Sequence, residues 1–173
     1  NDLQDYFALA KGRGVLPPAT PGIVVYEEIS DVVMEFAEEL RSYTDMQELP
    51  PLDVDICIGE SIITGHLENI WESALVEYRC IEKDRARHHI GVWIDHVALN
   101  CVQKPKYPRK SIFTRIGNSV LFNPLVDARA VMEMLLSYYL QGMTEPLRLF
   151  PEASAKYVYR FTKGHSHEAA LKA

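Results

Sequence analysis

The sequence is poor in cysteine, and the few it has are not spaced to build a cross-linked or metal-bound scaffold. Cys57, Cys80 and Cys101 are odd in number and widely separated, and they form no Cys-x-x-Cys pair. This pattern argues against a disulfide framework, a zinc ribbon and an iron–sulfur cluster. All three lie among apolar residues, so we expect buried free thiols. Free thiols in turn predict a reducing, cytoplasmic compartment.

Two further absences argue against other classes of protein. No apolar run approaches the ~18 residues of a membrane span and no signal peptide is visible, so no membrane partner is expected. Gly12-Arg13-Gly14 is followed by Val-Leu-Pro-Pro, where a phosphate-binding loop would continue with Gly-Lys-Ser/Thr. The sequence therefore predicts no helicase motor.

The length of 173 residues and the apolar fraction of 47% suit a single globular domain over residues 1–173. The first residue is Asn1 in place of Met, and residues 167–173 resemble the start of a helix that lacks a C-cap. We therefore expect the chain to be a fragment of a longer protein.

Positive charge is scarce in the first part of the chain and concentrated in the middle. Residues 1–79 hold 16 acidic and 4 basic side chains, whereas residues 80–115 hold 3 acidic and 8 basic ones. The remaining residues are close to balanced, and the formal net charge is −6. Phosphate binding needs local positive charge, so the basic middle is a weak indication of a nucleic-acid partner.

Hydrophobic spacing predicts alternating helical and extended segments. Helices are expected over residues 2–13 and 86–102, from an N-cap at Asp127 to about 140, and from about 152 onward. Residues 15–22 are expected to be irregular because of their three prolines. A long helix is expected to follow them and to end before residue 49, with a core stripe of Tyr26, Ile29, Val33, Phe36 and Leu40. Strands are expected over residues 52–58, where apolar residues alternate with polar ones, and over 61–67, 74–81, 112–116 and 120–122. Turns are expected at Gly59, between the first two strands, and at Gly117, between the last two. The third strand is the most continuously apolar and is predicted to be central, and the short links favour an antiparallel meander of the first three strands. This order is typical of an α/β fold with a mixed sheet.

That order, with acidic residues at the ends of the second and third strands, resembles the PD-(D/E)xK nuclease fold, a restriction-endonuclease-like mixed sheet flanked by helices. Several short segments more closely resemble the C-terminal domain of the RecC family, the gamma chain of exodeoxyribonuclease V. They are residues 14–17 (GVLP), 63–67 (ITGHL), 93–96 (WIDH), 142–147 (GMTEPL) and 149–152 (LFPE). The resemblance implies a cytoplasmic complex with RecB and RecD that unwinds duplex ends for recombinational repair. In such complexes the RecC part splits and channels the DNA, while RecB cuts it.

An active nuclease of this fold holds Mg²⁺ between two carboxylates, beside a lysine. The matching stretches here are Gly65-His66-Leu67-Glu68 and Glu77-Tyr78-Arg79. Arg79 replaces the lysine, Glu68 replaces the usual aspartate, and Tyr26 stands where RecB-like enzymes carry a metal-binding histidine. These departures favour a degenerate site without a cofactor. The alternatives are a solvated or ion-paired face formed by Glu68, Glu77 and Arg79, an active Mg²⁺-dependent nuclease using Glu68 and Glu77, or an inactive metal site.

The basic residues are the better candidates for contacts with double- or single-stranded DNA. They are Lys83, Arg85 and Arg87 after the third strand, Lys104, Lys106, Arg109 and Lys110 around Tyr107 in a proline-bent loop, and Arg115 on the hairpin. A tyrosine among cations suits a sugar–phosphate backbone or a stacked base. The competing interpretation is an ordinary solvated loop. A third hypothesis is a pure interaction module that docks on RecB or RecD.

Three histidines have no partners at the spacing of a metal or catalytic site. His88 and His89 are adjacent, so their side chains point apart, and we expect solvated helix positions. We likewise expect Asp95 and His96 to be solvated and not catalytic, because no nucleophilic serine or cysteine lies in a recognisable turn nearby.

Overall fold

The computed structural model describes residues 2–164, so the helix start predicted at residues 167–173 lies outside the described residues. The helices and strands occur in the predicted order. They are α1 (Asp2–Gly12), α2 (Thr20–Tyr43), β1 (Leu52–Ile58), β2 (Ser61–Leu67), β3 (Leu75–Arg79), α3 (Ala86–Val102), β4 (Ser111–Arg115), β5 (Asn118–Phe122), α4 (Ala128–Thr144) and α5 (Pro151–Thr162). Among the described residues, no helix is long and apolar enough to cross a membrane.

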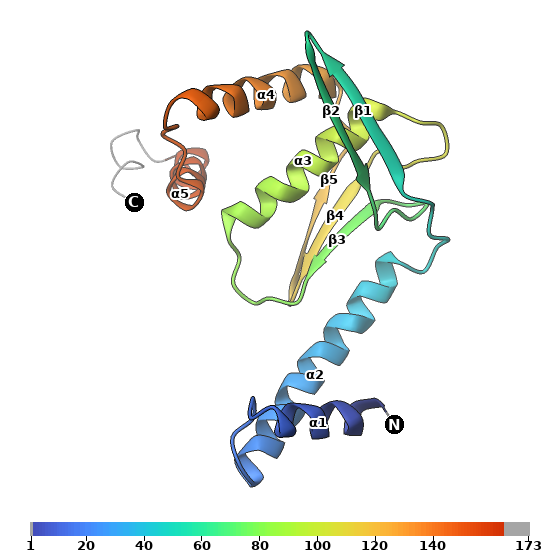
Figure 1. The fold of residues 1–173 in the computed structure, drawn as a ribbon, viewed down its shortest axis with the longest axis vertical. Coiled ribbons are helices and arrows are strands. Elements are labelled where there is room, and N and C mark those ends of the chain that lie inside the picture. The colour runs from blue at the N-terminus through green and yellow to red at the C-terminus, as the bar shows by residue number, and fades with distance from the viewer. Residues whose placement is uncertain (1, 165–173) are drawn as a thin grey trace.

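The strands form two sheets, as Figure 1 shows. β1 and β2 pair as an antiparallel hairpin across the predicted turn at Gly59. β3 pairs with β4 in parallel, and β4 pairs with β5 in antiparallel orientation, so the three-stranded sheet is mixed. The fold is therefore α/β, with a mixed sheet and an antiparallel pair flanked by helices, and it is compatible with a nuclease-like α/β fold.

The predicted meander of the first three strands is wrong. After β2 the chain makes two isolated bridges, Glu48 to Trp71 and Ile70 to Leu75, which lead it out of the hairpin. β3 then pairs in parallel with β4, because α3 forms the long crossover that parallel pairing requires. β3 is also an edge strand and not the central one. Its apolar run is explained by the burial of Leu75 and Val76 in the core.

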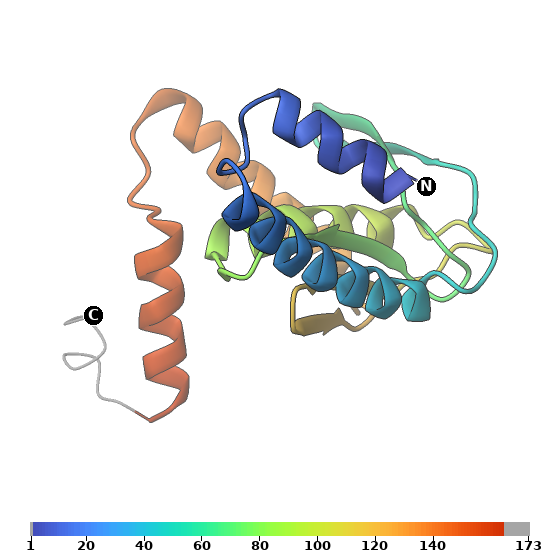
Figure 2. The same ribbon diagram turned by 90° about the horizontal axis from the view of Figure 1, so that it is seen from below.

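The helices α2 and α3 lie on opposite faces of the three-stranded sheet (Figures 1 and 2). On the α3 face, His96 contacts Ser111 of β4 and His89 packs edge-on against Phe113, with ring centroids 5.2 Å apart. On the other face, Glu39 of α2 reaches Thr114 of β4. Because successive strand residues alternate between faces, β4 contacts a different helix with each of its two sides.

The main hydrophobic core lies between the β1–β2 hairpin, α3 and α4. Its buried members are Leu52, Val54, Ile56, Leu67, Ile70, Leu75, Val97, Ala98, Leu99 and Met132. Leu52, Val54 and Ile56 are alternate residues of β1 and are buried in this core, as the period-two pattern of the strand predicts. α4 starts where predicted, because the side chain of Asp127 caps the helix by accepting a hydrogen bond from the Ala130 amide at 3.1 Å.

Two predictions about the first long helix and the cysteines are wrong. α2 begins at Thr20, within the stretch 15–22 that was predicted to be irregular, because Pro21 occupies the first turn, where a missing N–H does no harm. Cys57 and Cys80 are exposed and Cys101 is only half-buried, so apolar neighbours in sequence did not predict burial.

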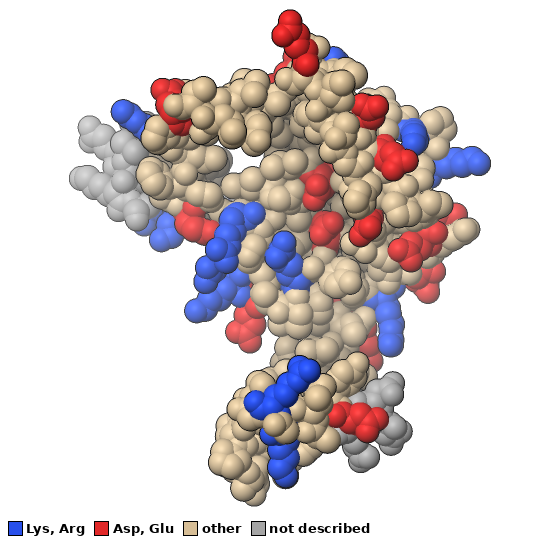
Figure 3. All heavy atoms as spheres, viewed as in Figure 1, with Lys and Arg blue, Asp and Glu red and all other residues tan. Residues whose placement is uncertain are grey.

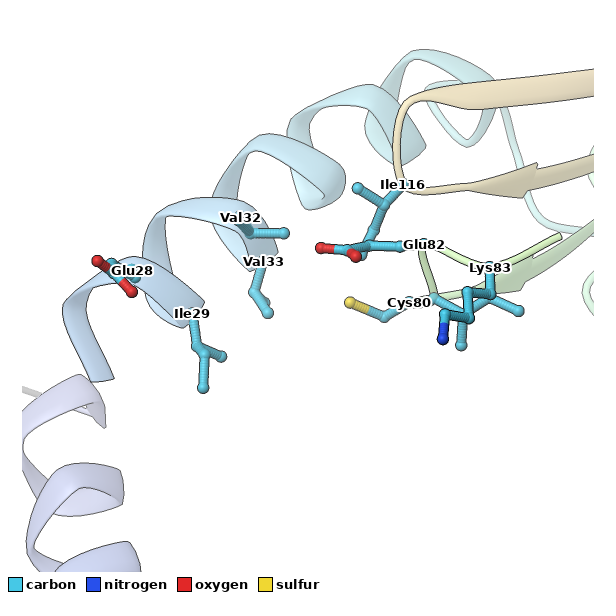
Figure 4. A pocket seen from close by; sticks show the side chains of 9 residues that line it. Glu28, Ile29, Val32, Val33, Cys80, Glu82, Lys83 and Ile116 are labelled. Carbon is cyan, nitrogen blue, oxygen red and sulfur yellow. The ribbon is translucent and has the colours of Figure 1, made fainter. Parts of the chain in front are cut away.

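Figure 4 shows why Cys80 is exposed: it lines an open groove of about 650 Å³ between α2 and the chain that follows β3. Ile29 and Val33 of α2 line the opposite side. These two residues belong to the predicted core stripe of the helix, yet they are 55% and 43% exposed. α2 therefore covers the sheet with its C-terminal half, where Phe36 is buried.

A carboxylate anchors that half of α2. Glu39 Oε1 lies 2.8 Å from Ser119 Oγ and 3.4 Å from Thr114 Oγ1, and the two hydroxyl oxygens lie 2.8 Å apart. Each hydroxyl has one proton to donate, and the carboxylate oxygen accepts from them. The arrangement joins α2 to both strands of the β4–β5 hairpin.

We expect Glu39→Ala to lower the free energy of unfolding by about 1–2 kcal/mol, because two hydroxyl donors lose a charged acceptor. Glu38→Ala is the matched control, since Glu38 is the exposed neighbour of Glu39 and its loss should change stability by less than about 0.5 kcal/mol. Urea unfolding of both variants measures the difference. Equal midpoints would show that the carboxylate does not anchor α2.

Candidate nucleic-acid interface

Glu77 and Arg79 project from β3 toward α3. In the parallel register, Glu77 lies beside Phe113 and Arg79 lies beside Arg115. Phe113 packs against a histidine of α3, so the side chains in register with it share the α3 face. Glu77 and Arg79 are two residues apart on β3, so both lie on the face of the sheet that α3 covers.

The environment of Glu77 is set by a second carboxylate, Asp95, which the sequence did not connect with it. Burial raises the pKa of Glu77, the charge of Asp95 on α3 raises it further, and the charge of Arg79 opposes both. Burial also raises the pKa of Asp95. Two half-buried carboxylates thus lie near one another, with an arginine where a nuclease would place its lysine.

Glu68 lies close to Glu77 along the backbone, because Ile70 bridges Leu75 and the Val76 amide donates to the Asn69 carbonyl at 2.9 Å, so that Glu68 and Glu77 are the next residues on the two antiparallel chains. Glu68 follows β2, is 64% exposed, and lies 3.6 Å from His66. Tyr26 lies in α2, where its ring contacts Phe7 of α1 edge-on at 5.0 Å. Within residues 2–164, no group of three or more His, Cys, Asp or Glu side chains is placed to hold a metal ion. Tyr26 offers no ring nitrogen and Arg79 no amine, so these side chains do not fit the complete magnesium site that the nuclease resemblance implies.

Three arginines converge at the N-terminal end of α3. Burial lowers the pKa of His88, and the charges of Arg79, Arg87 and Arg85 lower it further, so all three guanidinium groups act on one imidazole. Arg79 comes from the end of β3, whereas the other two flank the first residue of α3. We call Arg79, Arg85 and Arg87 the arginine cluster.

Figure 3 shows lysine and arginine side chains gathered over this end of α3 and the adjoining turn. Lys83 lies in the same turn and is exposed. Arg115, by contrast, is engaged: its side chain is 14% exposed, and it donates to the Glu82 carbonyl at 3.2 Å and to Asp84 at 3.3 Å. Arg115 therefore holds the turn that carries the cationic residues.

The second basic stretch lies at the opposite end of α3, about 25 Å away along a helix of 17 residues. Two of its members have structural partners. Tyr107 donates its hydroxyl to the Pro50 carbonyl at 3.1 Å, and Arg109 donates to the Leu125 carbonyl at 2.5 Å and to Asn100 Oδ1 at 3.3 Å. Lys104, Lys106 and Lys110 remain exposed. The predicted basic residues thus form two separate groups.

His96 is fully buried, so the prediction of a solvated position is wrong. Its Nε2 lies 3.0 Å from the Asn123 carbonyl, which can only accept, so Nε2 carries the proton. Nδ1 then accepts from the Ser111 hydroxyl at 2.8 Å. His88 is partly buried and His89 pairs with Asp84 at 2.5 Å, so neither is a simple solvated position.

Asn100 joins this network one turn further along α3. Its amide group donates to the carbonyls of His96 and Arg109, at 2.9 and 3.0 Å. Its Oδ1 accepts from the Leu125 amide at 3.1 Å and from the Arg109 side chain. Every hydrogen-bonding position of the Asn100 side chain is therefore used.

Sequence reasoning missed Asp95 as a partner of Glu77, and it missed that Arg79 belongs with the cations after β3. A signal for the second point is the register: a strand that ends at Arg79 and a helix that begins at Ala86 are neighbours in a β–α crossover. No signal in the sequence distinguishes the structural arginines from the exposed ones.

We expect Arg109→Ala to lower the free energy of unfolding by about 1–2 kcal/mol, because Asn100 and Leu125 each lose a donor. Lys110→Ala is the adjacent control and should change stability by less than about 0.5 kcal/mol. Chemical denaturation of both variants makes the comparison. If the two behave alike, Arg109 is not part of the buried network's support.

We expect Glu77→Gln to raise stability at pH 7 and to have little effect near pH 3. A carboxyl whose pKa is raised on folding contributes stability below its unfolded pKa of about 4, and that contribution is lost as pH rises through the folded pKa. Asp95→Asn should act alike, and the double variant should gain less than the sum, because either single change removes the mutual repulsion.

Thermal unfolding at the two pH values measures this effect, with the exposed Glu68→Gln as the control. A loss of stability in Glu77→Gln at pH 7 would mean that a cation or donor already compensates the carboxylate.

The comparisons with known proteins agree with the resemblance stated from the short segments. The chain matches the family model of the RecC C-terminal domain over residues 1–162. A search of curated proteins found no match. The family match spans all ten helices and strands of the structure. The chain belongs to the family of RecC C-terminal domains.

Proposed function

We propose that this chain, as a single nuclease-like domain over residues 1–173, contacts DNA and holds partner subunits without cutting. The family points to a RecC subunit of a RecBCD-type helicase–nuclease. RecB and RecD are then the protein partners, duplex and single-stranded DNA the nucleic-acid partners, and recombinational repair of double-strand breaks in the cytoplasm the process.

The observation that carries the DNA contact is the convergence of the arginine cluster. Its residues come from the end of β3 and the start of α3, where Figure 3 shows basic side chains gathered on one surface. Guanidinium groups bind phosphate oxygens in a fixed, often bidentate geometry. The more distant basic stretch has three exposed lysines but gives two of its other members to structural bonds. We therefore assign the main phosphate contacts to the arginine cluster, with Lys83 beside it.

The non-catalytic part of the proposal is supported by the surroundings of Glu77. Arg79 cannot replace a nuclease lysine, because its guanidinium is bulkier and permanently charged. Glu77 lies near Asp95, while the carboxylate of Glu68 is exposed beside His66. The cation that would serve cleavage in a nuclease is here part of the surface that holds the phosphate.

The test compares two triple substitutions with the same change of charge. Replacing Arg79, Arg85 and Arg87 by Gln should weaken DNA binding at least tenfold. It should also reduce the slope of log K against log salt by about 2–3, since each phosphate contact contributes about 0.9. Replacing Lys104, Lys106 and Lys110 by Gln should change the affinity less than threefold. Fluorescence anisotropy with labelled duplex and single-stranded oligonucleotides, at several salt concentrations, measures both. Equal losses in the two variants would contradict the assignment.

A pure protein-interaction module is the second candidate, and a specific observation favours it. The helices α4 and α5 and the segment between them expose many large apolar side chains: Tyr138, Tyr139, Leu140, Met143, Leu149, Phe150, Val158, Tyr159 and Phe161. Exposed apolar patches of this kind mark interaction surfaces. Absence of DNA binding by the unsubstituted chain, together with binding to RecB or RecD, would favour this candidate.

A further inference from the structure

The N-terminus of α3 has a residue pattern opposite to that of a stable helix start. Arg85 occupies the N-cap position and makes no side-chain capping bond, and the first turn contains no acidic residue. Cations near a helix N-terminus are unfavourable, because the free amide groups already carry partial positive charge. An anion close to this helix end would therefore stabilise it.

The anion comes from a distant helix. Glu152, in the first turn of α5, accepts a hydrogen bond from the Ala86 amide through Oε2 at 3.2 Å. Its charge also opposes the effect of the arginine cluster on His88. A carboxylate that accepts a backbone N–H among guanidinium groups uses the same interactions as a phosphate oxygen.

α5 is weakly attached to the rest of the molecule. No residue of α5 is buried, and Val158, Tyr159 and Phe161 are each more than half exposed. An open groove of about 820 Å³ separates α5 from the start of α3. A helix of 12 residues depends on packing for its stability, so few contacts mean that little free energy holds it in place.

The charge of α5 gives it one attraction for the cationic end of α3. Glu152 is the only acidic residue of the helix, which also contains Lys156 and Arg160. Figure 2 shows α5 standing apart from the sheet. Glu152 is therefore the one residue of α5 whose charge attracts the cationic end of α3.

We propose that Glu152 is an internal substitute for a DNA phosphate, so that α5 covers the arginine cluster and is displaced when the nucleic-acid backbone binds there. The inference rests on the proposed function, since it names the site and the competitor for the same DNA contact. α5 is then a self-docked segment that weakens binding to short or weakly held DNA.

The first test measures the affinity of the intact chain for a labelled oligonucleotide. E152Q should bind about two- to fivefold more tightly than the unsubstituted chain, because a competing surface charge is removed. E145Q is the matched control: it makes the same change of charge at the C-terminal end of α4, where the side chain bonds to Gln141. E145Q should leave the affinity unchanged. The effect of E152Q should vanish when the arginine cluster is replaced by Gln.

The second test measures displacement directly. Hydrogen exchange of the α5 backbone amides should accelerate when oligonucleotide is added to the unsubstituted chain. In E152Q the same amides should exchange faster even without DNA.

The outcomes separate this inference from the proposed function. If E152Q and E145Q tighten binding equally, the effect is one of net charge and the inference is wrong. If the unsubstituted chain and E152Q bind equally well, or if α5 exchange does not respond to DNA, the inference is wrong while the DNA contact stands. If neither binds DNA, both proposals are wrong.

Discussion

A buried polar network fixes α3, and the positions of the functional side chains depend on it. His96 bonds to the sheet through Ser111 and to the loop after β5 through Asn123. Asn100 adds Arg109 and Leu125, so two stretches of chain, residues 109–111 and 123–125, meet on one turn of α3. Buried polar groups stabilise a structure only when each has a partner, and in this network every position of Asn100 has one. Because the C-terminal half of α3 is held in this way, its N-terminal end is directed toward the end of β3.

The positive charge at the N-terminal end of α3 follows from where β3 ends and where α3 begins. β3 ends at Arg79 and α3 begins at Ala86, so the cations of the connecting turn lie beside a helix N-terminus. This arrangement lowers the stability of the helix start, since both the dipole and the arginines are positive there. Below it, Glu77 and Asp95 form a like-charged pair that is also unfavourable at neutral pH. Local rules are broken most often where a protein binds something, which is why we assign function to this end of α3.

The sequence predicts the local elements well, because their signals are local. The period-two pattern of β1, the hairpin turns at Gly59 and Gly117, and the Asp127 cap all lie within a few residues of the feature they determine. The pairing of β3 could not be read in this way. A short link after β2 favoured a meander, whereas the parallel partner lies more than thirty residues further along the chain.

The site was predictable in part for the same reason. The sequence shows a basic group at Lys83, Arg85 and Arg87 because these residues are close together in the chain. Arg79 joins this group only in the folded structure, through the β3–α3 connection. The burial of His96 depends on Ser111 and Asn123, and the role of Arg109 depends on Leu125, all distant in sequence. Cys80 has apolar neighbours along the chain, yet it faces the open groove beside α2. The burial and bonding of these residues depend on partners that the fold brings together and not on the residue types.

The central claim is that this nuclease-like domain holds DNA but does not cut it. The most direct test incubates end-labelled linear duplex and single-stranded DNA with the chain in Mg²⁺ or Mn²⁺, at protein concentrations that bind the DNA, beside the Glu77→Ala variant. We predict that the DNA is bound and recovered intact, with no cleavage above that of the variant. Metal-dependent cleavage that disappears in Glu77→Ala would contradict it, because Arg79 would then serve in place of the missing lysine.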